Sequence, residues 1–467
     1  MIMSWYVPLL RFRTVLYATV LIFIFTDIEI TLAEGWRAGS ASEVITPEIE
    51  IWMAGYGGRK QPAQGTIHDL HVKALALEDP EGSRSVIVTA DLIGTTRDFS
   101  NRVASRIGKR YKLNRENIFI NSSHTHCGPE TRVPHMFYIP SGWSEEIDDY
   151  LVFLEDRFVT VISRALDSLE PAEISFTTAK PVPFAVSRRL PTPEGIAYRS
   201  GPSSYYTGGP RDDTSPVLTV TDMNGTVRTI LFGYACHPIT LNIDYYCGDY
   251  PGFAQLYVEK EFPGATAMFM QGCAGQLVPN ARYQIEYAEG HGHALADAVI
   301  KAVNSDRTPV TGTLASAYEE IPLEFEPLPD RATLEAQAAS DNETTRKKAV
   351  YYLTKLDNGE PVDTVLPWPF QTMRIGNGIL LVGLSGEAVV EYSVKFKSTF
   401  PVYDFVWVAG YTNHVFGYLP TWRIQREGGY EGGTSYSHMP TTGMFTETVE
   451  KLVTDGVTRL AEQVTPK

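Results

Sequence analysis

Positive charge is scarce in this sequence of 467 residues. Lysine and arginine number 40 against 55 aspartates and glutamates, which leaves a formal net charge of -15 at pH 7. Proteins that bind nucleic acids need basic surfaces to neutralise the phosphates. The charge balance therefore argues against a nucleic-acid partner. A content of 43% hydrophobic and 20% charged residues likewise excludes a disordered chain.

Long apolar stretches are almost missing as well, with one exception close to the N-terminus. Arg11 and Arg13 precede an apolar run over residues 15–25, and residues 31–33 offer a cleavage site before Glu34. This arrangement is typical of a secretory signal peptide, and the run is short for a membrane span of about 20 residues. We predict a signal peptide over residues 1–33 and a secreted or periplasmic protein. An uncleaved N-terminal anchor is the alternative, and contact of the exported protein with a membrane surface stays open.

Cysteine is also scarce, with four residues in the whole chain: Cys127, Cys236, Cys247 and Cys273. Their spacings match no Cys-x-x-Cys zinc motif. We interpret them as small buried residues, although an oxidising compartment would permit one disulfide bridge. The glycine-rich residues 53–59 lack the Gly-Lys-Ser/Thr of a phosphate-binding loop, so they do not indicate a nucleotide.

Strand and helix patterns alternate along most of the chain. Apolar β-rich runs predict strands, and apolar residues at intervals of three and four predict helices. The expected strands cover residues 38–44, 72–77, 85–89, 118–120, 174–178, 217–221, 227–234, 265–270, 319–325 and 405–409, with a hairpin over 372–384. The expected helices cover residues 100–111, 144–169, 250–261, 289–304, 332–356, 388–396 and 445–464. We therefore predict an α/β protein, a mixed β-sheet flanked by helices, with one large domain over residues 34–467.

Turn residues and prolines add detail to this outline. The Asn-Gly pairs at 224–225 and 377–378 predict hairpin turns. Pro322 places the strand over residues 319–325 at an edge of its sheet. Residues 190–215 and 410–438 are rich in glycine and have no regular pattern, so we predict long loops there.

Two histidines follow the buried strand that is predicted over residues 118–120. Alternate side chains of a strand point to the same side, so His124 and His126 are expected to face one side together. Two imidazoles placed in this way suit one metal ligand and one acid or base beside it. The alternative is a loop with two exposed histidines.

Other residue types that bind metals also stand at the ends of predicted elements, namely His237, Glu387 and, in the last long loop, Tyr418. The ends of strands are where α/β folds build their sites. Two or three His and Glu ligands with one open position are typical of catalytic zinc. Each residue has a structural alternative: a hydrogen-bonded histidine, a helix-capping glutamate and a packed tyrosine. His68 and His71 are weaker candidates, because their spacing before a strand spreads them apart.

Eight short stretches resemble, in order, the catalytic region of the neutral/alkaline non-lysosomal ceramidases, zinc-dependent amidases that split ceramide into sphingosine and a fatty acid. They are AGYG (54–57), SHTHCGP (123–129), ACHP (235–238), GDYPG (248–252), QGCAG (271–275), SGE (385–387), GYTN (410–413) and YEG (430–432). SHTHCGP and YEG are the most specific of them. The resemblance covers the chain from about residue 35 to the C-terminus.

The resemblance implies roles for seven side chains. It implies a zinc ion (Zn2+) held by His124, His237, Glu387 and Tyr418, and contacts to the amide from His126, Arg188 and Tyr430. Arg189 remains the alternative to Arg188, because the family has an Asn-Arg pair where this chain has two arginines. The chain departs from the family at Val278, where the family has a serine that is proposed to act at the amide. We also expect no counterpart of the C-terminal immunoglobulin-like domain of longer ceramidases within residues 34–467.

These observations together favour an exported zinc-dependent hydrolase of a linear amide. The leading substrate is an N-acyl lipid such as ceramide, with metal-activated water as the nucleophile. One alternative is a metal amidase of the same fold with a non-lipid substrate, such as an N-acyl sugar or a peptide-like amide. The other is a binding protein without catalytic activity.

Overall fold

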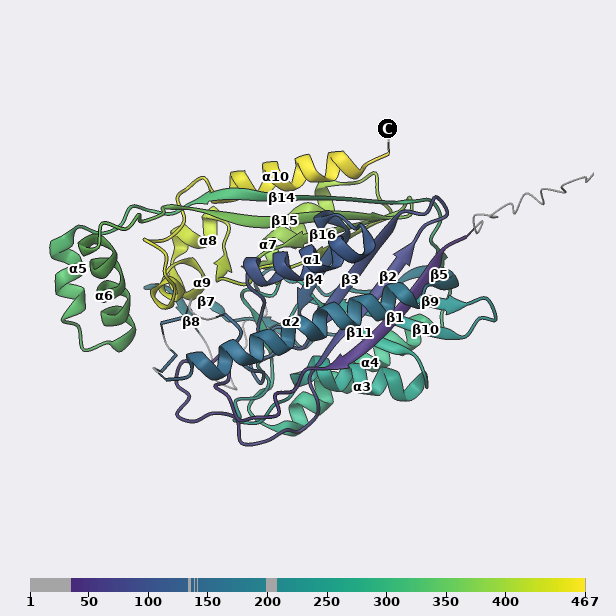
Figure 1. Ribbon diagram of the computed structural model, residues 1–467, viewed down its shortest axis with the longest axis horizontal. Helices are drawn as coiled ribbons and strands as arrows, with labels where there is room; N and C mark the ends of the chain where they lie inside the picture. The colour runs from purple at the N-terminus through teal and green to yellow at the C-terminus, as the bar shows by residue number, and fades with distance from the viewer. Residues whose placement is uncertain (1–34, 133–135, 138, 141, 199–207, 467) are drawn as a thin grey trace, which may run out of the picture. The chain divides into compact units, whose positions relative to one another are not determined.

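Two β-sheets face each other between layers of helices (Figure 1). The structure is a computed structural model that describes residues 35–132, 136–137, 139–140, 142–198 and 208–466. The signal peptide predicted over residues 1–33 lies outside the described residues. Within the described part, the mixed α/β domain predicted from the sequence is confirmed.

The larger sheet has the strand order β11-β10-β9-β5-β1-β2-β3-β4, and β13 pairs with β5. The pairs β3–β4 and β10–β11 are parallel, and the pairs between the other neighbours are antiparallel. Its strands are β1 (Arg37–Val44), β2 (His71–Glu78), β3 (Arg84–Ala90), β4 (Ile118–Ser122), β5 (Glu170–Ala179), β9 (Ser215–Asp222), β10 (Val227–Tyr234), β11 (Thr266–Gln271) and β13 (Thr308–Pro309).

The smaller sheet has the order β14-β15-β16-β18, with a parallel pair between β16 and β18. Pro322 lies in the edge strand β14, as its missing N–H predicts. The strands are β14 (Leu314–Glu324), β15 (Val365–Ile375), β16 (Ile379–Leu384) and β18 (Phe405–Ala409). Three short ribbons pair β6 (Ala185–Ser187) with β12 (Leu277–Pro279), β7 (Arg189–Thr192) with β8 (Gly195–Tyr198), and β17 (Glu387–Ala388) with β19 (Tyr418–Leu419).

Central strands are buried on both faces. In β2, Ala74 and Ala76 belong to the core under α2, whereas Leu75 and Leu77 belong to the core between the two sheets. Successive strand residues point to opposite faces. A strand between two layers therefore has an uninterrupted apolar sequence, which is what the sequence shows here.

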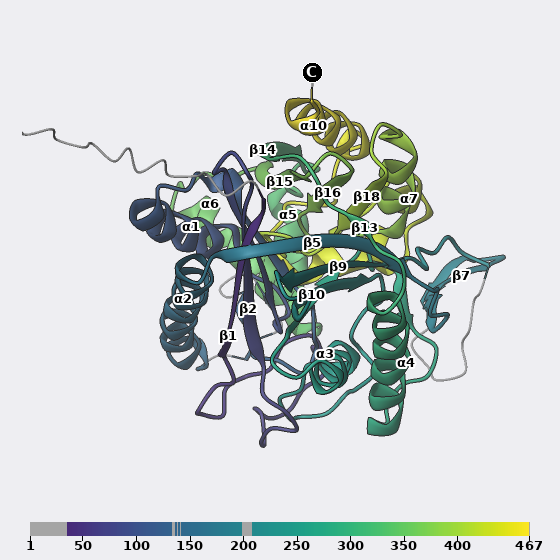
Figure 2. The same cartoon turned by 90° about the vertical axis from the view of Figure 1, so that its right-hand side faces the viewer.

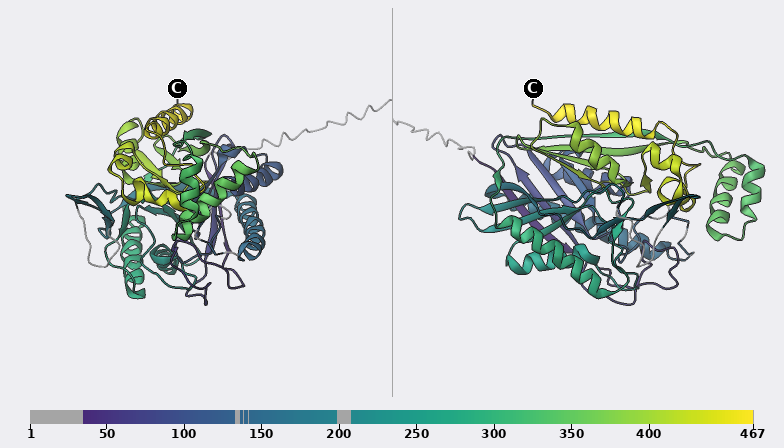
Figure 3. Two further views of the ribbon diagram at one scale, coloured as in Figure 1. Left: turned by 90° about the vertical axis from the view of Figure 1, so that its left-hand side faces the viewer. Right: turned by 180° about the vertical axis from the view of Figure 1, so that it is seen from behind.

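Helices cover the outer faces of both sheets (Figures 2 and 3). α2 packs on β1 and β2, with α1 beside it. The pair α3 and α4 covers β9 and β11, and α7 and α10 cover the smaller sheet. The bounds are α1 (Arg97–Tyr111), α2 (Ser144–Asp167), α3 (Asp249–Glu261), α4 (Ile285–Val303), α7 (Val390–Thr399) and α10 (Val449–Val464), with a short 3-10 turn η1 (Arg115–Asn117). In the part of the chain that the structure describes, no helix combines the length and apolarity of a membrane span.

The single helix predicted over residues 332–356 is wrong. Two helices, α5 (Arg331–Ala338) and α6 (Glu343–Asp357), replace it. The Asn342 side chain accepts a hydrogen bond from the backbone N–H of Thr345 and so starts a new helix. Asparagine is among the best N-cap residues because its side chain satisfies a free N–H of the first turn.

The irregular loops predicted over residues 190–215 and 410–438 are wrong in part. The first contains most of β7 and all of β8, and its residues 199–207 lie outside the described residues. The second contains β19, α8 (Trp422–Glu427), α9 (Gly429–Gly432) and the 3-10 turn η2 (Thr434–His438). Each element is too short to produce a periodic signal in the sequence.

Candidate metal and catalytic site

The carboxyl ends of β4, β10 and β16 deliver three side chains to one place. His124 follows β4, His237 follows β10, and Glu387 follows β16. A backbone bridge between Asn121 and Thr412 joins the end of β4 to the loop after β18. The site therefore spans both sheets, which is why segments far apart in the sequence contribute to it.

The two histidines present lone pairs to the Glu387 carboxylate. The Nδ1 of His124 lies 2.6 Å from the carbonyl oxygen of Ile93, and the Nδ1 of His237 lies 2.6 Å from that of Ala274. A carbonyl only accepts hydrogen bonds, so each Nδ1 carries the proton and each Nε2 is unprotonated in the neutral ring. These Nε2 atoms lie 3.2 and 2.9 Å from Glu387 Oε2, which is also an acceptor. Three acceptors this close repel one another unless a metal ion or a proton lies among them, and this donor set fits a metal ion.

Electrostatics favour a metal over a proton in this position. Burial, with the nearby Arg188 charge, lowers the pKa of His237 to about 4. Burial alone would raise the pKa of Glu387, but His124 and His237 hold it well below its usual range. At neutral pH His237 is therefore neutral and Glu387 is ionised, which are the forms of these groups that bind metals.

His126 completes a group of three histidines whose ring nitrogens lie within 4.8 Å of one another. Neither of its ring nitrogens has a hydrogen-bond partner among the described residues, although both are buried. Burial and the two other histidines lower the pKa of His126 well below 6.5. A buried, neutral and unpartnered imidazole is available either to a metal or to a substrate.

His124 and His126 come together, but strand alternation is not the reason. β4 ends at Ser122, and His124 has a left-handed backbone with φ of 67°. The two ring centroids are 5.0 Å apart. Behind His126, Gly55 with φ of 90° leaves no room for a side chain, since an added Cβ would lie 2.4 Å from the ring. Arg59 Nη2 donates to the backbone oxygen of His126 at 2.6 Å.

Arg188, and not Arg189, reaches the site. Arg188 Nη2 donates to the Tyr418 phenol oxygen at 2.6 Å and to the Gly275 carbonyl at 2.7 Å, and its Nε donates to Glu431 at 2.6 Å. Arg189 turns away to Glu431 at 2.9 Å and to a second glutamate. Burial raises the pKa of the Tyr418 phenol well above 10 in spite of Arg188, so a metal would have to displace its proton.

A cavity of about 670 Å3 opens in front of these groups. Tyr430 lies on its wall, with its ring centroid 5.4 Å from that of Tyr418 and 5.4 Å from the Arg188 guanidinium carbon. The described lining residues are mostly polar or aromatic: Gly55, Tyr56, Gly57, Gly58, Arg59, Lys60, Gln61, His126, Arg188, Tyr198, Ile239, Asn242, Asp244, Tyr418 and Tyr430. The cavity can therefore admit a substrate to His126, Arg188 and Tyr430 together.

Val278 lies beside this cavity in a small apolar cluster with Val186 and Ile239. It belongs to β12, where it pairs with Val186 of β6. The side chain is buried and offers no hydroxyl to the site. Where the family has a serine, this chain therefore has a valine that packs against other apolar side chains.

Sequence reasoning missed Tyr411 and Glu431 as members of the site. The Tyr411 ring lies 4.4 Å from that of His124, its backbone is left-handed with φ of 52°, and its buried hydroxyl has no described partner. Glu431 is the buried partner of Arg188. Both residues belong to stretches that resemble the family, GYTN and YEG. Their place in these stretches was the one feature of the sequence that could have indicated a role in the site.

Other residues singled out in the sequence have structural roles. His68 Nε2 accepts the backbone N–H of Gly248 at 2.8 Å, away from the three histidines. His71 begins β2 and pairs with Val44 of β1. All four cysteines are buried and unbridged, so the structure contains no disulfide among them.

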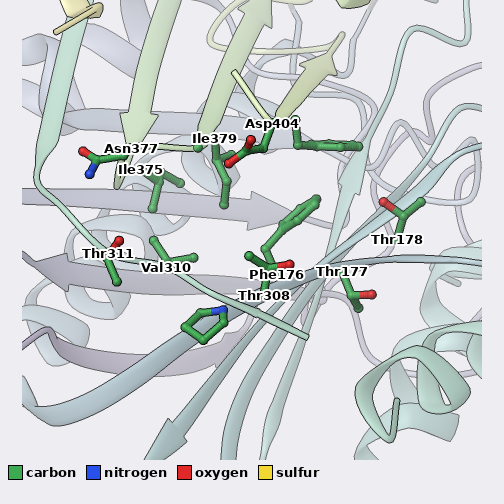
Figure 4. Close-up of a pocket in the computed structure, with 13 residues that line it drawn as sticks. Phe176, Thr177, Thr178, Thr308, Val310, Thr311, Ile375, Asn377, Ile379 and Asp404 are labelled. Carbon is green, nitrogen blue, oxygen red and sulfur yellow. The ribbon is translucent and has the colours of Figure 1, made fainter. Parts of the chain in front are cut away.

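A second cavity, of about 350 Å3, lies at the amino ends of β16 and β18, whereas Glu387 follows the carboxyl end of β16 (Figure 4). Its walls include Ile379 at the start of β16 and Phe405 at the start of β18, with Asp404 and Asn377 beside them. None of the predicted site residues lines it. The catalytic candidates therefore belong to the first cavity alone.

Over the aligned segments, this chain is about a quarter identical to several neutral ceramidases. The protein of Drosophila melanogaster is 25% identical over 259 residues, which cover 51% of this chain and 35% of the relative. That of Oryza sativa subsp. japonica is 27% identical over 253 residues, covering 52% and 30%. The matched segments thus span about a third of the length of these relatives.

The fold has solved counterparts. The crystal structure of neutral ceramidase from Pseudomonas aeruginosa superposes with a TM-score of 0.71 at 20% identity, over 93% of this chain and 75% of that chain. A ceramidase complexed with C2 gives the same TM-score over 93% and 76%. Residues 36–314, more than half of the chain, match the profile described as "Neutral/alkaline non-lysosomal ceramidase, N-terminal". On that match, this protein belongs to the neutral/alkaline non-lysosomal ceramidase family.

Proposed function

We propose that this protein is an exported, zinc-dependent hydrolase of linear amides, with an N-acyl lipid such as ceramide as its first candidate substrate. One observation carries the proposal. The Nε2 atoms of His124 and His237 and the Oε2 of Glu387 converge as unprotonated acceptors beside His126, which lines the cavity. Family membership and the similarity to neutral ceramidases support amide hydrolysis.

The proposed zinc ligands are His124, His237, Glu387 and Tyr418. Two imidazoles and a carboxylate with one further ligand suit zinc, which prefers nitrogen and oxygen donors in a tetrahedral set. Tyr418 is paired with Glu387 in the β17–β19 ribbon, and this proximity supports its phenol as the further donor. When bound, zinc supplies a nucleophilic water at neutral pH and polarises the substrate carbonyl.

The remaining side chains act on the amide itself. Arg188 and Tyr430 can donate hydrogen bonds to the carbonyl oxygen as negative charge develops on it, an effect worth about 3 kcal/mol per donor. His126 can take the proton of the attacking water and pass it to the leaving nitrogen, because the ring is neutral and its nitrogens bond to no residue in the described part of the chain. The products are then a carboxylic acid and an amine. Val278 offers no nucleophile, so no covalent acyl step is assigned to that position.

A hydrophilic amide is the second candidate substrate. Ile239 is the one aliphatic side chain among the described residues that line the cavity. A long acyl chain gains about 0.8 kcal/mol per buried CH2 only where apolar walls receive it. The lining therefore supports an amide with small polar groups, such as an N-acyl sugar, as the alternative to a long-chain lipid.

Metal analysis followed by an amide panel tests both candidates. We expect about one zinc per purified chain, with loss of metal and of hydrolysis after treatment with a strong chelator and recovery of both on adding zinc. The panel would compare ceramide, a fluorogenic long-chain N-acyl amide, its acetyl counterpart and an N-acetylated amino sugar. Absence of bound metal would contradict the zinc proposal. Full metal content without hydrolysis of any amide would favour the non-catalytic binding protein.

Export is part of the same proposal. The charged and apolar pattern of residues 1–33 supports it, as argued from the sequence. N-terminal sequencing of the protein recovered from its producing cell would test it. A mature N-terminus near residue 34 is expected, and an intact Met1 on a membrane-bound protein would instead support the anchor.

A further inference from the structure

We infer that Glu431 is a positioning residue that fixes both proposed amide donors, Arg188 and Tyr430, through one buried carboxylate. The inference rests on the proposed function for its catalytic meaning. The geometry does not depend on the proposed function: the Glu431 carboxylate is bonded to Arg188, and Glu431 follows Tyr430 directly in the sequence.

Glu431 determines the orientation of the Arg188 guanidinium. Its Oε1 accepts from Arg188 Nε at 2.6 Å, while Arg188 Nη2 is held by Gly275 and Tyr418. A guanidinium is planar and rigid, so these bonds fix the plane of the group. They leave Nη1 with no hydrogen bond to a described residue, on a side chain that lines the cavity. Nη1 is therefore the edge that Glu431 holds ready for a substrate oxygen.

Glu431 also tethers the segment that carries Tyr430. Both residues belong to α9, a four-residue helix with glycine at both of its ends. Gly428 and Gly429 have φ of 68° and 78°. Glycine-rich backbone has little rigidity of its own, because glycine has the widest conformational freedom. The buried ion pairs of Glu431 with Arg188 and Arg189 therefore tie this segment to the start of β7.

Glu431 is the carboxylate partner of Arg188, and Arg189 shares it. Arg189 has its own partner in Glu427, at 3.0 Å, and Glu427 is also bonded to Arg423. Glu431 is 1% exposed, whereas the Glu427 side chain is 33% exposed. Removing the buried carboxylate would leave Arg188 buried without a counter-charge. Removing the outer one changes a partly solvated pair, so Glu427→Gln is a matched control.

The test measures kcat, KM, metal content and thermal stability for wild type, Glu431→Gln and Glu427→Gln, on whichever amide the wild type hydrolyses. We expect Glu431→Gln to keep its metal and to lose about a hundredfold in kcat with little change in KM, as misplacement of a donor by about 1 Å does. Glu427→Gln should change kcat by less than about fivefold. Equal losses in the two variants, or loss of metal in Glu431→Gln, would overturn the inference.

A double-mutant cycle separates positioning from simple stabilisation. In an Arg188→Ala background, the same Glu431→Gln change should lower kcat by much less than in the wild type, because the donor that it positions is already gone. Independent, fully additive losses would mean that Glu431 does not act through Arg188. If Glu431→Gln does not fold, Glu431→Asp keeps the charge, shortens the reach, and should give the same loss in kcat.

Crystal structures of wild type and Glu431→Gln provide a measurement that needs no turnover. The contact of 2.6 Å between Arg188 Nη2 and Tyr418 should be lost in the variant and kept in Glu427→Gln. If the wild type hydrolyses no amide, the proposed function fails, yet this comparison still decides the positioning role. An unmoved Arg188 in Glu431→Gln would overturn it.

Discussion

At the residue scale, His126 and Tyr418 differ in the hydrogen bonds that their side chains already make. The Tyr418 phenol accepts a hydrogen bond from Arg188 at 2.6 Å, whereas both ring nitrogens of His126 lack a hydrogen-bond partner among the residues that the structure describes. Either side chain lies close enough to His237 and Glu387 to be considered as a ligand. The proposed division, with Tyr418 on the metal and His126 on the substrate, therefore has a direct test.

Changing His126 to Ala should leave the metal bound and remove most of the rate. His124, His237 and Glu387 remain to hold the ion, while proton transfer to the leaving amine, typically worth about a hundredfold or more, is lost. Elemental analysis and kcat on the same preparation measure both effects. His124→Ala is the reference, since it should lose metal and activity together. If His126→Ala loses as much metal as His124→Ala, His126 is itself a ligand.

Changing Tyr430 to Phe removes one hydroxyl and keeps the ring in place. Its contacts with Tyr198 and Tyr418 are ring contacts, with centroids 5.1 and 5.4 Å apart, and these should survive. We expect kcat to fall about a hundredfold with little change in KM, because the hydrogen bond forms mainly in the transition state. Tyr198→Phe, on an exposed ring of the same cavity, is the control. An unchanged kcat in Tyr430→Phe would remove Tyr430 from the mechanism.

At the scale of elements, the glycine-rich loop over residues 54–59 packs against His126. Gly55 touches the His126 ring closely, and Arg59 donates to the His126 backbone. Gly58 lines the same cavity, yet an added Cβ there meets no atom within 4 Å. Gly55 and Gly58 therefore provide a test substitution and its control within one loop.

Changing Gly55 to Ala should lower both stability and rate. The left-handed backbone disfavours a side chain, and the added methyl group collides with His126, so we expect a loss of at least about 1 kcal/mol in unfolding free energy. The displaced imidazole should reduce kcat by about tenfold or more. Thermal unfolding and steady-state kinetics check the two effects. Gly58→Ala should leave both nearly unchanged, and equal behaviour of the two variants would mean that the loop does not position His126.

At the scale of the whole molecule, buried ionisable groups couple stability to pH in opposite directions. The pKa of His237 is lowered to about 4, so the stability it contributes is present above its unfolded value of about 6.5 and is lost as pH falls through this window. His126 is shifted in the same direction. Burial raises the pKa of Asp249 to about 6, so its contribution is present below its unfolded value of about 3.9 and is lost as pH rises through about 6.

The metal-free protein should therefore lose stability between pH 7.5 and 6, where the histidines act almost alone. Each histidine that stays neutral in the fold contributes a slope of up to about 1.4 kcal/mol per pH unit. Below about pH 6 Asp249 should offset the slope of about one histidine, because its contribution to stability changes with pH in the opposite direction. Urea unfolding of chelator-treated protein at intervals of half a pH unit measures the curve. Stability that is constant or rises between pH 7.5 and 6 would contradict the neutral state of these histidines.

Local sequence patterns predicted most of the strands, helices and turns. Strands buried on both faces, such as β2 and β16, have uninterrupted apolar sequences, and amphipathic helices such as α2 show their period directly. The Asn-Gly turns and Pro322 also had their predicted effects, since each acts through its own backbone. Short elements such as α9, and the break before α6, escaped because capping and tertiary contacts define them.

The sequence by itself determined which residue types were available for a site, and its short stretches indicated the family. Only the tertiary structure decided how they meet. His124 and His126 face each other because of a left-handed backbone and not through strand alternation. Arg188 rather than Arg189 reaches Tyr418 because β7 turns the next side chain toward Glu427. Such choices depend on contacts between segments more than 200 residues apart, which no local period encodes.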